Sequence, residues 1–226
     1  MTASRGLLTA FTTGAKQRRV LLPVFTAAGT GLLGLSLATR PGSGRFYVLT
    51  NAVAATWIAG GLAAGPPPRG RSRHPVATPV LIGAGAFGVF YAAALVARRI
   101  PVLSRALAGV LAYAHRGSGP AVLATTLVTG AAEEVFFRGV VQEPGTAVAA
   151  STAVYALSTV ATRNPALVLA SVVMGTVFGL QRRVTGGVQA PLLTHVVWSA
   201  LMLRYLPPLF ETPAPDRVPD HGPRRY

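Results

Sequence analysis

The sequence predicts an all-α protein, a polytopic transmembrane helical bundle of about eight helices. Two observations indicate this. The first is composition, because 51% of the 226 residues are hydrophobic and only 12% are charged, which is too few charges for the surface of a soluble domain. The second is the order along the chain, where eight apolar runs alternate with short segments rich in arginine, proline or glycine. Such runs are typical of helices that cross a membrane.

The first two apolar runs follow a polar segment. Residues 1–19 are mostly small or polar and end in the basic stretch KQRR, so we expect a cytoplasmic N-terminal segment. The run at residues 20–38 is long enough to span and ends without a small-residue cleavage site, so it is interpreted as an uncleaved first helix. A second helix is expected over residues 46–64, because the three prolines at 66–68 cannot continue it.

The third and fourth runs complete the first half of the chain. Residues 76–97 carry glycines at positions 83, 85 and 88, which permit close helix packing. Residues 100–114 form a shorter run that contains Arg105, so this run is either a short span or a helix that lies at the membrane interface. The sequence leaves these two alternatives open.

The second half contains the remaining four apolar runs. They lie at residues 120–141, 146–161, 166–181 and 188–206. Turns rich in proline or glycine separate the last three of them. Residues 207–226 form a Pro-rich, charged tail, which we expect to be disordered.

The charge of the chain is strongly basic, with 21 basic and 6 acidic residues. The arginines lie singly or in pairs between apolar runs, and no basic stripe interleaved with aromatic residues is present. This pattern favours topology signals and lipid-headgroup contacts over nucleic-acid binding. If all eight runs cross, most arginines fall on the side of the N-terminus. We therefore expect a multi-pass protein of the cell membrane with both termini in the cytoplasm.

The first acidic side chains of the chain lie within an apolar run. Glu133, Glu134 and Arg138 each cost about 2.5 to 3.5 kcal/mol at the centre of a spanning helix, so they are candidates for function. Glu134 and Arg138, at i and i+4, can pair and largely neutralise each other, which leaves Glu133 without that partner. A lone carboxylate in a low dielectric suits a general base that acts on water. The alternative is that both glutamates cap or salt-bridge a helix end at the lipid surface.

His195 is the one histidine of four that falls within a predicted span. Ser199 follows it by one helical turn on the same face. A buried imidazole needs hydrogen-bond partners, and we expect Glu133 to be one if the two helices pack together. The alternative is a core histidine whose hydrogen bonds are satisfied and which has no role in chemistry. Cysteine is absent, which excludes disulfides, thiolate metal sites and cysteine catalysis.

Four stretches carry a resemblance to a known family. EEVFFRG (133–139) resembles the E-E-x-x-x-R signature of the CPBP family, which includes type II CAAX prenyl endopeptidases and the bacteriocin-processing or self-immunity proteins labelled Abi. GTVFGL (175–180), RRVTGG (182–187) and APLLTH (190–195) are similar to the family's run from a Gly-rich helix through a T-G turn to a histidine helix. The resemblance covers roughly residues 120–206, interpreted as a CPBP-like catalytic core. Residues 20–119 carry no motif of their own.

The resemblance implies an intramembrane endopeptidase whose catalytic groups open towards one membrane face. In that pattern Glu133 activates a water molecule, a histidine at the end of an F-x-x-x-H motif assists it, and His195 stabilises the oxyanion together with an Asn or Asp four residues later. Ser199 occupies that last position here and can still donate a hydrogen bond. Glu134 and Arg138 have supporting roles.

The second motif departs from the family pattern. Tyr155 to Thr159 match its spacing, but Thr159 stands where histidine belongs. No other histidine lies between Glu134 and His195, so a shifted alignment does not restore the motif. Threonine is neither a base nor a strong metal ligand near neutral pH. Tyr155 and Thr159 are therefore supporting members of the predicted site.

The family is often described as metalloproteases, so zinc is a possible cofactor by resemblance. A zinc site needs three or four ligands. Only Glu133, Glu134 and His195 are candidates within the spans, and Arg138 is expected to engage Glu134. The ligand set is thus incomplete, and we expect any metal to be weakly held, by Glu133 and His195, or absent.

Three functions remain open. The leading hypothesis is a CPBP-type endopeptidase that cleaves a hydrophobic or membrane-tethered peptide or protein within the lipid bilayer. The second, motivated by Thr159, is a catalytically inactive relative that acts as a membrane scaffold or immunity protein. The third and least favoured is a small transporter, for which intramembrane charges are also typical. Carriers usually contain two repeated halves, and no such repeat relates residues 20–114 to residues 120–206.

Overall fold

The computed structural model describes residues 2–210, with side chains from residue 20 onward, and within that range the protein is helical and contains no strand. The predicted all-α bundle of about eight helices is confirmed. The helices are α1 (Thr2–Leu37), α2 (Gly44–Ala63), α3 (Ala77–Ala97), α4 (Pro101–Arg116), α5 (Gly119–Glu133), α6 (Val148–Val160), α7 (Pro165–Thr185) and α8 (Gln189–Tyr205). A π-helix, η1 (Glu134–Val141), continues α5, and a 3-10 helix, η2 (Pro207–Phe210), follows α8.

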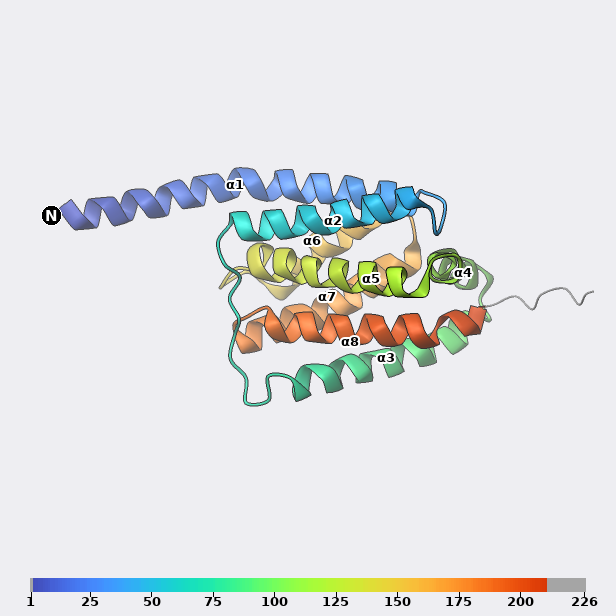
Figure 1. Ribbon diagram of the computed structural model, residues 1–226. Helices are drawn as coiled ribbons and strands as arrows, with labels where there is room; N and C mark the ends of the chain where they lie inside the picture. Colours follow the sequence, from blue (N-terminus) through green and yellow to red (C-terminus); the bar gives the residue numbers. More distant parts are fainter. Residues whose placement is uncertain (1, 211–226) are drawn as a thin grey trace, which may run out of the picture.

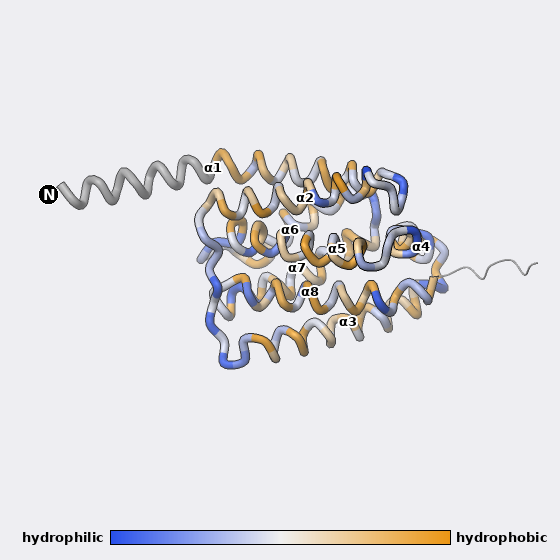
Figure 2. The backbone as a smooth tube through the Cα atoms, viewed as in Figure 1, coloured by the Kyte–Doolittle hydropathy of each residue, from blue (hydrophilic) through white to orange (hydrophobic). Residues whose placement is uncertain are grey.

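The helices other than α4 run along one bundle, with α5 between α2 and α8 (Figure 1). Five segments of the described chain are long and apolar enough to cross a membrane. They are Val20–Leu37, Gly44–Ala63, Ala77–Ala97, Gly119–Val141 and Pro165–Thr185. Hydrophobic residues occur along the length of the bundle, and hydrophilic residues gather at its two ends (Figure 2). Large apolar side chains such as Leu81 and Val89 are exposed on the outside, as contact with lipid requires. The protein is therefore a membrane protein.

Helix α1 begins at Thr2, not at residue 20 as predicted. Residues 2–19 continue the first apolar helix beyond the end of the bundle (Figure 1). They include good helix formers and no proline, and extending an existing helix needs no new nucleation. Polarity predicted the end of the apolar run correctly but not the end of the helix.

Helix α4 lies across one end of the bundle and is seen nearly end-on in Figure 1. Asn164 in the α6–α7 turn donates through Nδ2 to the carbonyl of Ala106, at 2.8 Å. The hydroxyl of Tyr113 donates to the carbonyls of Leu37 and Thr39, at 2.6 and 2.8 Å. The two alternatives for residues 100–114 are thereby decided, because α4 is a helix at the end of the bundle and does not cross it.

The position of α4 changes the predicted topology. Because α3 ends and α5 begins at the same end, Thr2 and Phe210 lie at opposite ends of the bundle (Figure 1). The prediction of both termini in the cytoplasm assumed eight crossings, and it stays a prediction. Basic residues now lie at both ends, so the positive-inside rule assigns no orientation. The end with the α2–α3 and α7–α8 connections carries Arg69, Arg71, Arg73, Arg182 and Arg183. The end with α4 and the α1–α2 and α6–α7 connections carries Arg40, Arg45, Arg98, Arg99, Arg105, Arg116, Arg163 and Arg204.

The first four residues of the tail that was predicted to be disordered are ordered. Pro207–Phe210 form the 3-10 helix η2, which packs against α4 and α8. Leu206, Ala94 and Leu111 form a buried apolar cluster beside it, and burial of these side chains holds the turn in place. Residues 211–226 lie outside the described range.

Two close helix contacts set the spacing of the bundle. Of the glycines predicted to allow close packing in α3, only Gly83 faces α8, where an added Cβ would lie 2.9 Å from the carbonyl oxygen of Thr194. Gly85 and Gly88 have nothing within 4 Å of such a Cβ. Against η1, Trp57 of α2 packs on Phe136 with ring centroids 4.8 Å apart. These contacts pack α3 closely against α8 and α2 closely against η1.

Candidate active site

The glutamate pair lies where the helix changes type. The α-helix ends at Glu133, and residues 134–141 are π-helical, with the amide of Gln142 bonded to the carbonyl of Phe137 at 2.9 Å. In an α-helix that amide would bond to the carbonyl of Arg138. Here that carbonyl instead accepts a hydrogen bond of 2.7 Å from Nε of Arg182. The predicted continuous α-helix over residues 120–141 is therefore wrong in its second half. Such π segments are rare and often occur at functional sites.

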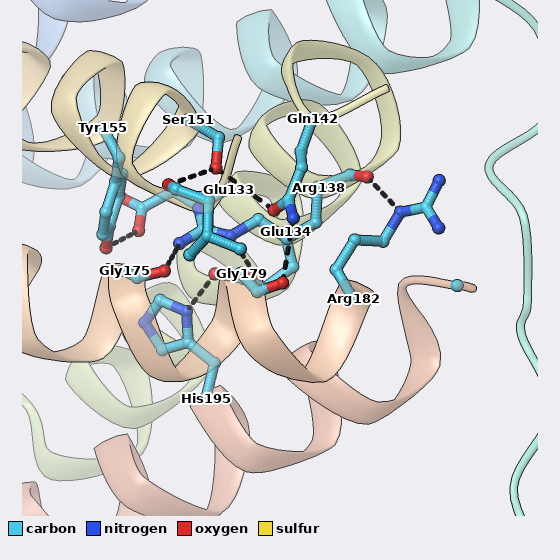
Figure 3. A network of polar contacts seen from close by, with 12 residues as sticks. Glu133, Glu134, Arg138, Gln142, Ser151, Tyr155, Gly175, Gly179, Arg182 and His195 are labelled. Atoms are coloured by element: carbon cyan, nitrogen blue, oxygen red, sulfur yellow. Dashed lines mark hydrogen bonds and ion pairs between the residues drawn. The ribbon is translucent and has the colours of Figure 1, made fainter. Parts of the chain in front are cut away.

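Glu133 is held by a residue of α6. The hydroxyl of Tyr155 donates to Oε2 of Glu133 at 2.8 Å (Figure 3). The tyrosine ring lies edge-on to Phe137, with centroids 4.9 Å apart, and the guanidinium carbon of Arg138 is 4.9 Å from its centroid. Glu133 is thus not a lone carboxylate, because a tyrosine on a neighbouring helix supplies a hydrogen-bond partner that the sequence did not indicate.

Glu134 binds two partners and is fully buried. Its Oε1 is 3.0 Å from Nδ1 of His195, and its Oε2 is 3.4 Å from Nε of Arg138, so the predicted i, i+4 pair is present (Figure 3). Glu134, not Glu133, is the hydrogen-bond partner of His195. The correction follows from helix rotation, because adjacent residues project in different directions and it is the carboxylate of Glu134 that reaches Nδ1 of His195.

The ring of His195 has a defined orientation. A carboxylate only accepts hydrogen bonds, so the contact with Glu134 assigns the proton to Nδ1. The ring stacks on Phe178, with centroids 4.7 Å apart and an interplanar angle of 19°. A Cβ at Gly130 would lie 3.0 Å from its Nε2, so a side chain at position 130 would crowd the ring. Among the described residues Nε2 makes no hydrogen bond, which leaves it available to a bound molecule.

One cavity connects most of the predicted site residues. Its volume is ≈ 330 Å³, and its wall includes Glu133, Tyr155, Thr159, His195 and Ser199. Most other lining residues are apolar, and several come from α4, which lies at one end of the bundle. Glu134 and Arg138 do not line the cavity. They lie behind its wall, where Glu134 contacts both Arg138 and His195. A polar site thus opens into an apolar chamber.

Thr159 and Ser199, which depart from the family pattern, differ in whether their hydroxyl groups are already hydrogen-bonded. The hydroxyl of Thr159 donates to the carbonyl of Tyr155 at 3.0 Å and is therefore used within its own helix. Ser199 is buried, lines the cavity and bonds to no described side chain. Two further donors, Thr129 Oγ1 and Trp198 Nε1, belong to residues that line the cavity, and both atoms are buried without a hydrogen-bond partner among the described residues. The sequence analysis missed both, although Thr129 lies four residues before Glu133 on the same helical face.

A second polar layer anchors the end of the π-helix. Gln142 donates through Nε2 to the carbonyl of Gly179 at 2.9 Å, and Ser151 donates to Oε1 of Gln142 at 3.2 Å. Arg138 donates through a terminal nitrogen to the carbonyl of Gly175 at 2.9 Å (Figure 3). These contacts tie η1 to α6 and α7, and no motif in the sequence indicated them.

The residues of the site do not fit a zinc ion. No group of three or more His, Cys, Asp or Glu able to hold a metal occurs within residues 2–210. Nδ1 of His195 is bonded to Glu134, and Oε2 of Glu133 accepts from Tyr155. Thr159, where the family resemblance places a histidine, bonds to its own helix. The donor set therefore falls short of the three protein ligands of a catalytic zinc.

Comparison with known proteins gives one match. Residues 115–201 match the family model described as Rce1-like, type II CAAX prenyl endopeptidase Rce1-like. The matched segment runs from the end of α4 into α8 and contains all seven predicted site residues. Comparison with curated proteins finds no match, and neither does comparison with solved structures. The resemblance predicted from the sequence, to a membrane protease family of CAAX type, is confirmed.

Proposed function

From the premise that residues 115–201 form an Rce1-like segment of a membrane-embedded protease family, we propose that this protein is an intramembrane endopeptidase of the cell membrane. It hydrolyses a peptide bond in a hydrophobic or membrane-tethered protein. One observation carries the proposal. The carboxylate of Glu133, oriented by Tyr155, lies in the wall of an apolar cavity that also presents His195 and Ser199.

The reaction follows from these groups. Glu133 accepts a proton from a water molecule, and the water oxygen forms a bond to the carbonyl carbon of the substrate. The carbonyl π electrons move to its oxygen, and the resulting oxyanion is stabilised by the hydroxyl of Ser199 and by the ring of His195. The carbon–nitrogen bond then breaks, and the departing amine takes the proton from Glu133. Glu133 leaves the cycle as a carboxylate.

Glu134 and Arg138 support this chemistry from behind the cavity wall. Glu134 accepts the Nδ1 proton of His195, which orients the ring. Arg138 balances the charge of Glu134 in a fully buried setting. Arg138 also binds the carbonyl of Gly175, so its own charge is partly compensated by α7.

The substrate class follows from the lining of the cavity. Apolar residues from several helices surround the chamber, so it favours an apolar segment over a charged one. The family description names CAAX prenyl endopeptidases, which adds a prenylated protein with a C-a-a-X end as a candidate substrate. Both candidates are hydrophobic and membrane-tethered.

The test is cleavage by purified protein reconstituted in lipid vesicles. The substrates are a fluorogenic library of membrane-tethered peptides and a prenylated C-a-a-X peptide. We expect Glu133→Gln to lower kcat/KM by about 10²- to 10⁴-fold, because a general base is lost. Glu143→Gln is the matched control, since Glu143 is exposed in the turn after η1 and does not line the cavity. Glu133→Gln with wild-type activity would overturn the proposal.

A catalytically inactive membrane scaffold is the second candidate function. Thr159 favours it, because its hydroxyl is bound to the carbonyl of Tyr155 and no histidine is present at that position. This candidate predicts that wild-type protein cleaves neither class of substrate. It also predicts that Glu133→Ala preserves the cellular phenotype while the protein remains folded.

A further inference from the structure

The hydrogen bond between α6 and Glu133 comes from an unexpected position. By family resemblance the α6 group that assists Glu133 belongs at position 159, but the hydroxyl of Thr159 is bonded to the carbonyl of Tyr155. One turn earlier, the hydroxyl of Tyr155 donates to Oε2 of Glu133 at 2.8 Å. Within the described residues, the side-chain hydrogen bond to the Glu133 carboxylate therefore comes from Tyr155. The contact from α6 to Glu133 thus lies one helical turn before the position that the family resemblance assigns to it.

We propose that Tyr155 is the positioning residue of Glu133 and takes the place of the histidine that the family resemblance assigns to position 159. Its hydroxyl binds Oε2, so that Oε1 remains free to accept the proton of a water molecule in the cavity. The proposal rests on the proposed endopeptidase function. It adds that activity is retained in this chain without a second-motif histidine.

The surroundings of Tyr155 fix its hydroxyl in space. The ring is held between Phe137 and the guanidinium of Arg138, both 4.9 Å from its centroid. A Cβ at Gly175 would lie 3.1 Å from Cδ1 of the ring, so α7 closes a further side. The residue is 9% exposed. A side chain packed on three sides has little freedom to rotate, and its hydrogen bond therefore restricts the rotation of Glu133.

Tyr155 acts through Glu133 and not on the substrate. A phenol that donates to one carboxylate oxygen orients the other, and it remains a donor after Glu133 has accepted a proton. A catalytic base that is misplaced by rotation loses rate even when substrate binding is unchanged. The signature of this role is a lower kcat with an unchanged KM.

The experiment removes one oxygen atom. Tyr155→Phe keeps the ring and its contacts with Phe137 and Arg138. We expect kcat to fall by about 10- to 100-fold, the effect of losing a hydrogen bond to a charged group. KM should stay within about twofold of wild type. The unfolding temperature should fall by no more than a few degrees, because a single hydrogen bond is lost. Tyr91→Phe is the matched control, because Tyr91 is a partly buried tyrosine of α3 outside the cavity.

A second substitution separates positioning from structure. In the Tyr155→Phe background, Thr159→His places an imidazole on the next turn of α6, where it lines the same cavity. We expect it to restore about tenfold of the lost kcat, since an imidazole N–H can replace the phenol as a donor. An unchanged kcat in Tyr155→Phe, or a loss that Thr159→His does not restore, overturns the inference. If Glu133→Gln is inactive in the same assay, either result leaves the proposed function standing. If Glu133→Gln is active, the proposed function itself fails.

Discussion

The two ends of the cavity are held by different interactions. The site end comprises Glu133, Tyr155, His195 and Ser199. Behind it, the buried carboxylate of Glu134 in η1 pairs with Arg138 and with His195. At the α4 end, Tyr113 and Asn164 make neutral hydrogen bonds to backbone carbonyls, and much of α4 is exposed. Removing one partner of a buried charged pair costs far more than removing one neutral hydrogen bond. The site end is therefore expected to be rigid, and the α4 end is expected to be the looser part of the chamber.

The largest expected effect is at Glu134. Glu134→Gln leaves the fully buried guanidinium of Arg138 without its counter-charge and weakens the hold on His195. We expect the free energy of unfolding to fall by about 3–5 kcal/mol, as measured by denaturation in detergent micelles. Adding Arg138→Met should recover much of this loss, because the pair is then removed as a whole. A single variant as stable as wild type would show that the charges at the site end do not hold it together.

An intermediate effect is expected at Arg182. Arg182→Met removes the donor to the carbonyl of Arg138, which the π-helix has left without its α-helical partner. A buried carbonyl without a donor costs about 1–3 kcal/mol of unfolding free energy. Arg183→Met is the matched control, because Arg183 is the adjacent arginine and is exposed. Equal stability of the two variants would contradict a role for Arg182 in stabilising η1.

The smallest effect is expected at the α4 end. Tyr113→Phe removes the hydrogen bonds from α4 to Leu37 and Thr39 and leaves the ring in place. We expect a loss of about 0.5–1.5 kcal/mol. Hydrogen exchange of α4 should rise while exchange in η1 stays unchanged. A rise that extends into η1 would mean that the two ends of the cavity unfold together and that the contrast between them is wrong.

Much of the fold was determined by the sequence alone. Apolar runs predict helices because hydropathy is local, and all eight predicted runs contain a helix. Glu133, Glu134, Arg138 and His195 stood out because ionisable groups are costly within apolar runs. The family resemblance rested on the same residues, and it was confirmed over residues 115–201. The roles of these residues in catalysis remain predictions.

The tertiary structure decided how these elements meet. Whether residues 100–114 cross depended on contacts of α4 with Leu37 and Asn164, which lie far away in the sequence. The pairing of His195 with Glu134 and of Tyr155 with Glu133 depended on the rotation of α5, α6 and α8 about their axes. The π-helix depended on Arg182, 44 residues beyond the carbonyl that it binds. Local composition fixes which segments become helices, whereas hydrogen bonds between distant segments select which side chains face one another.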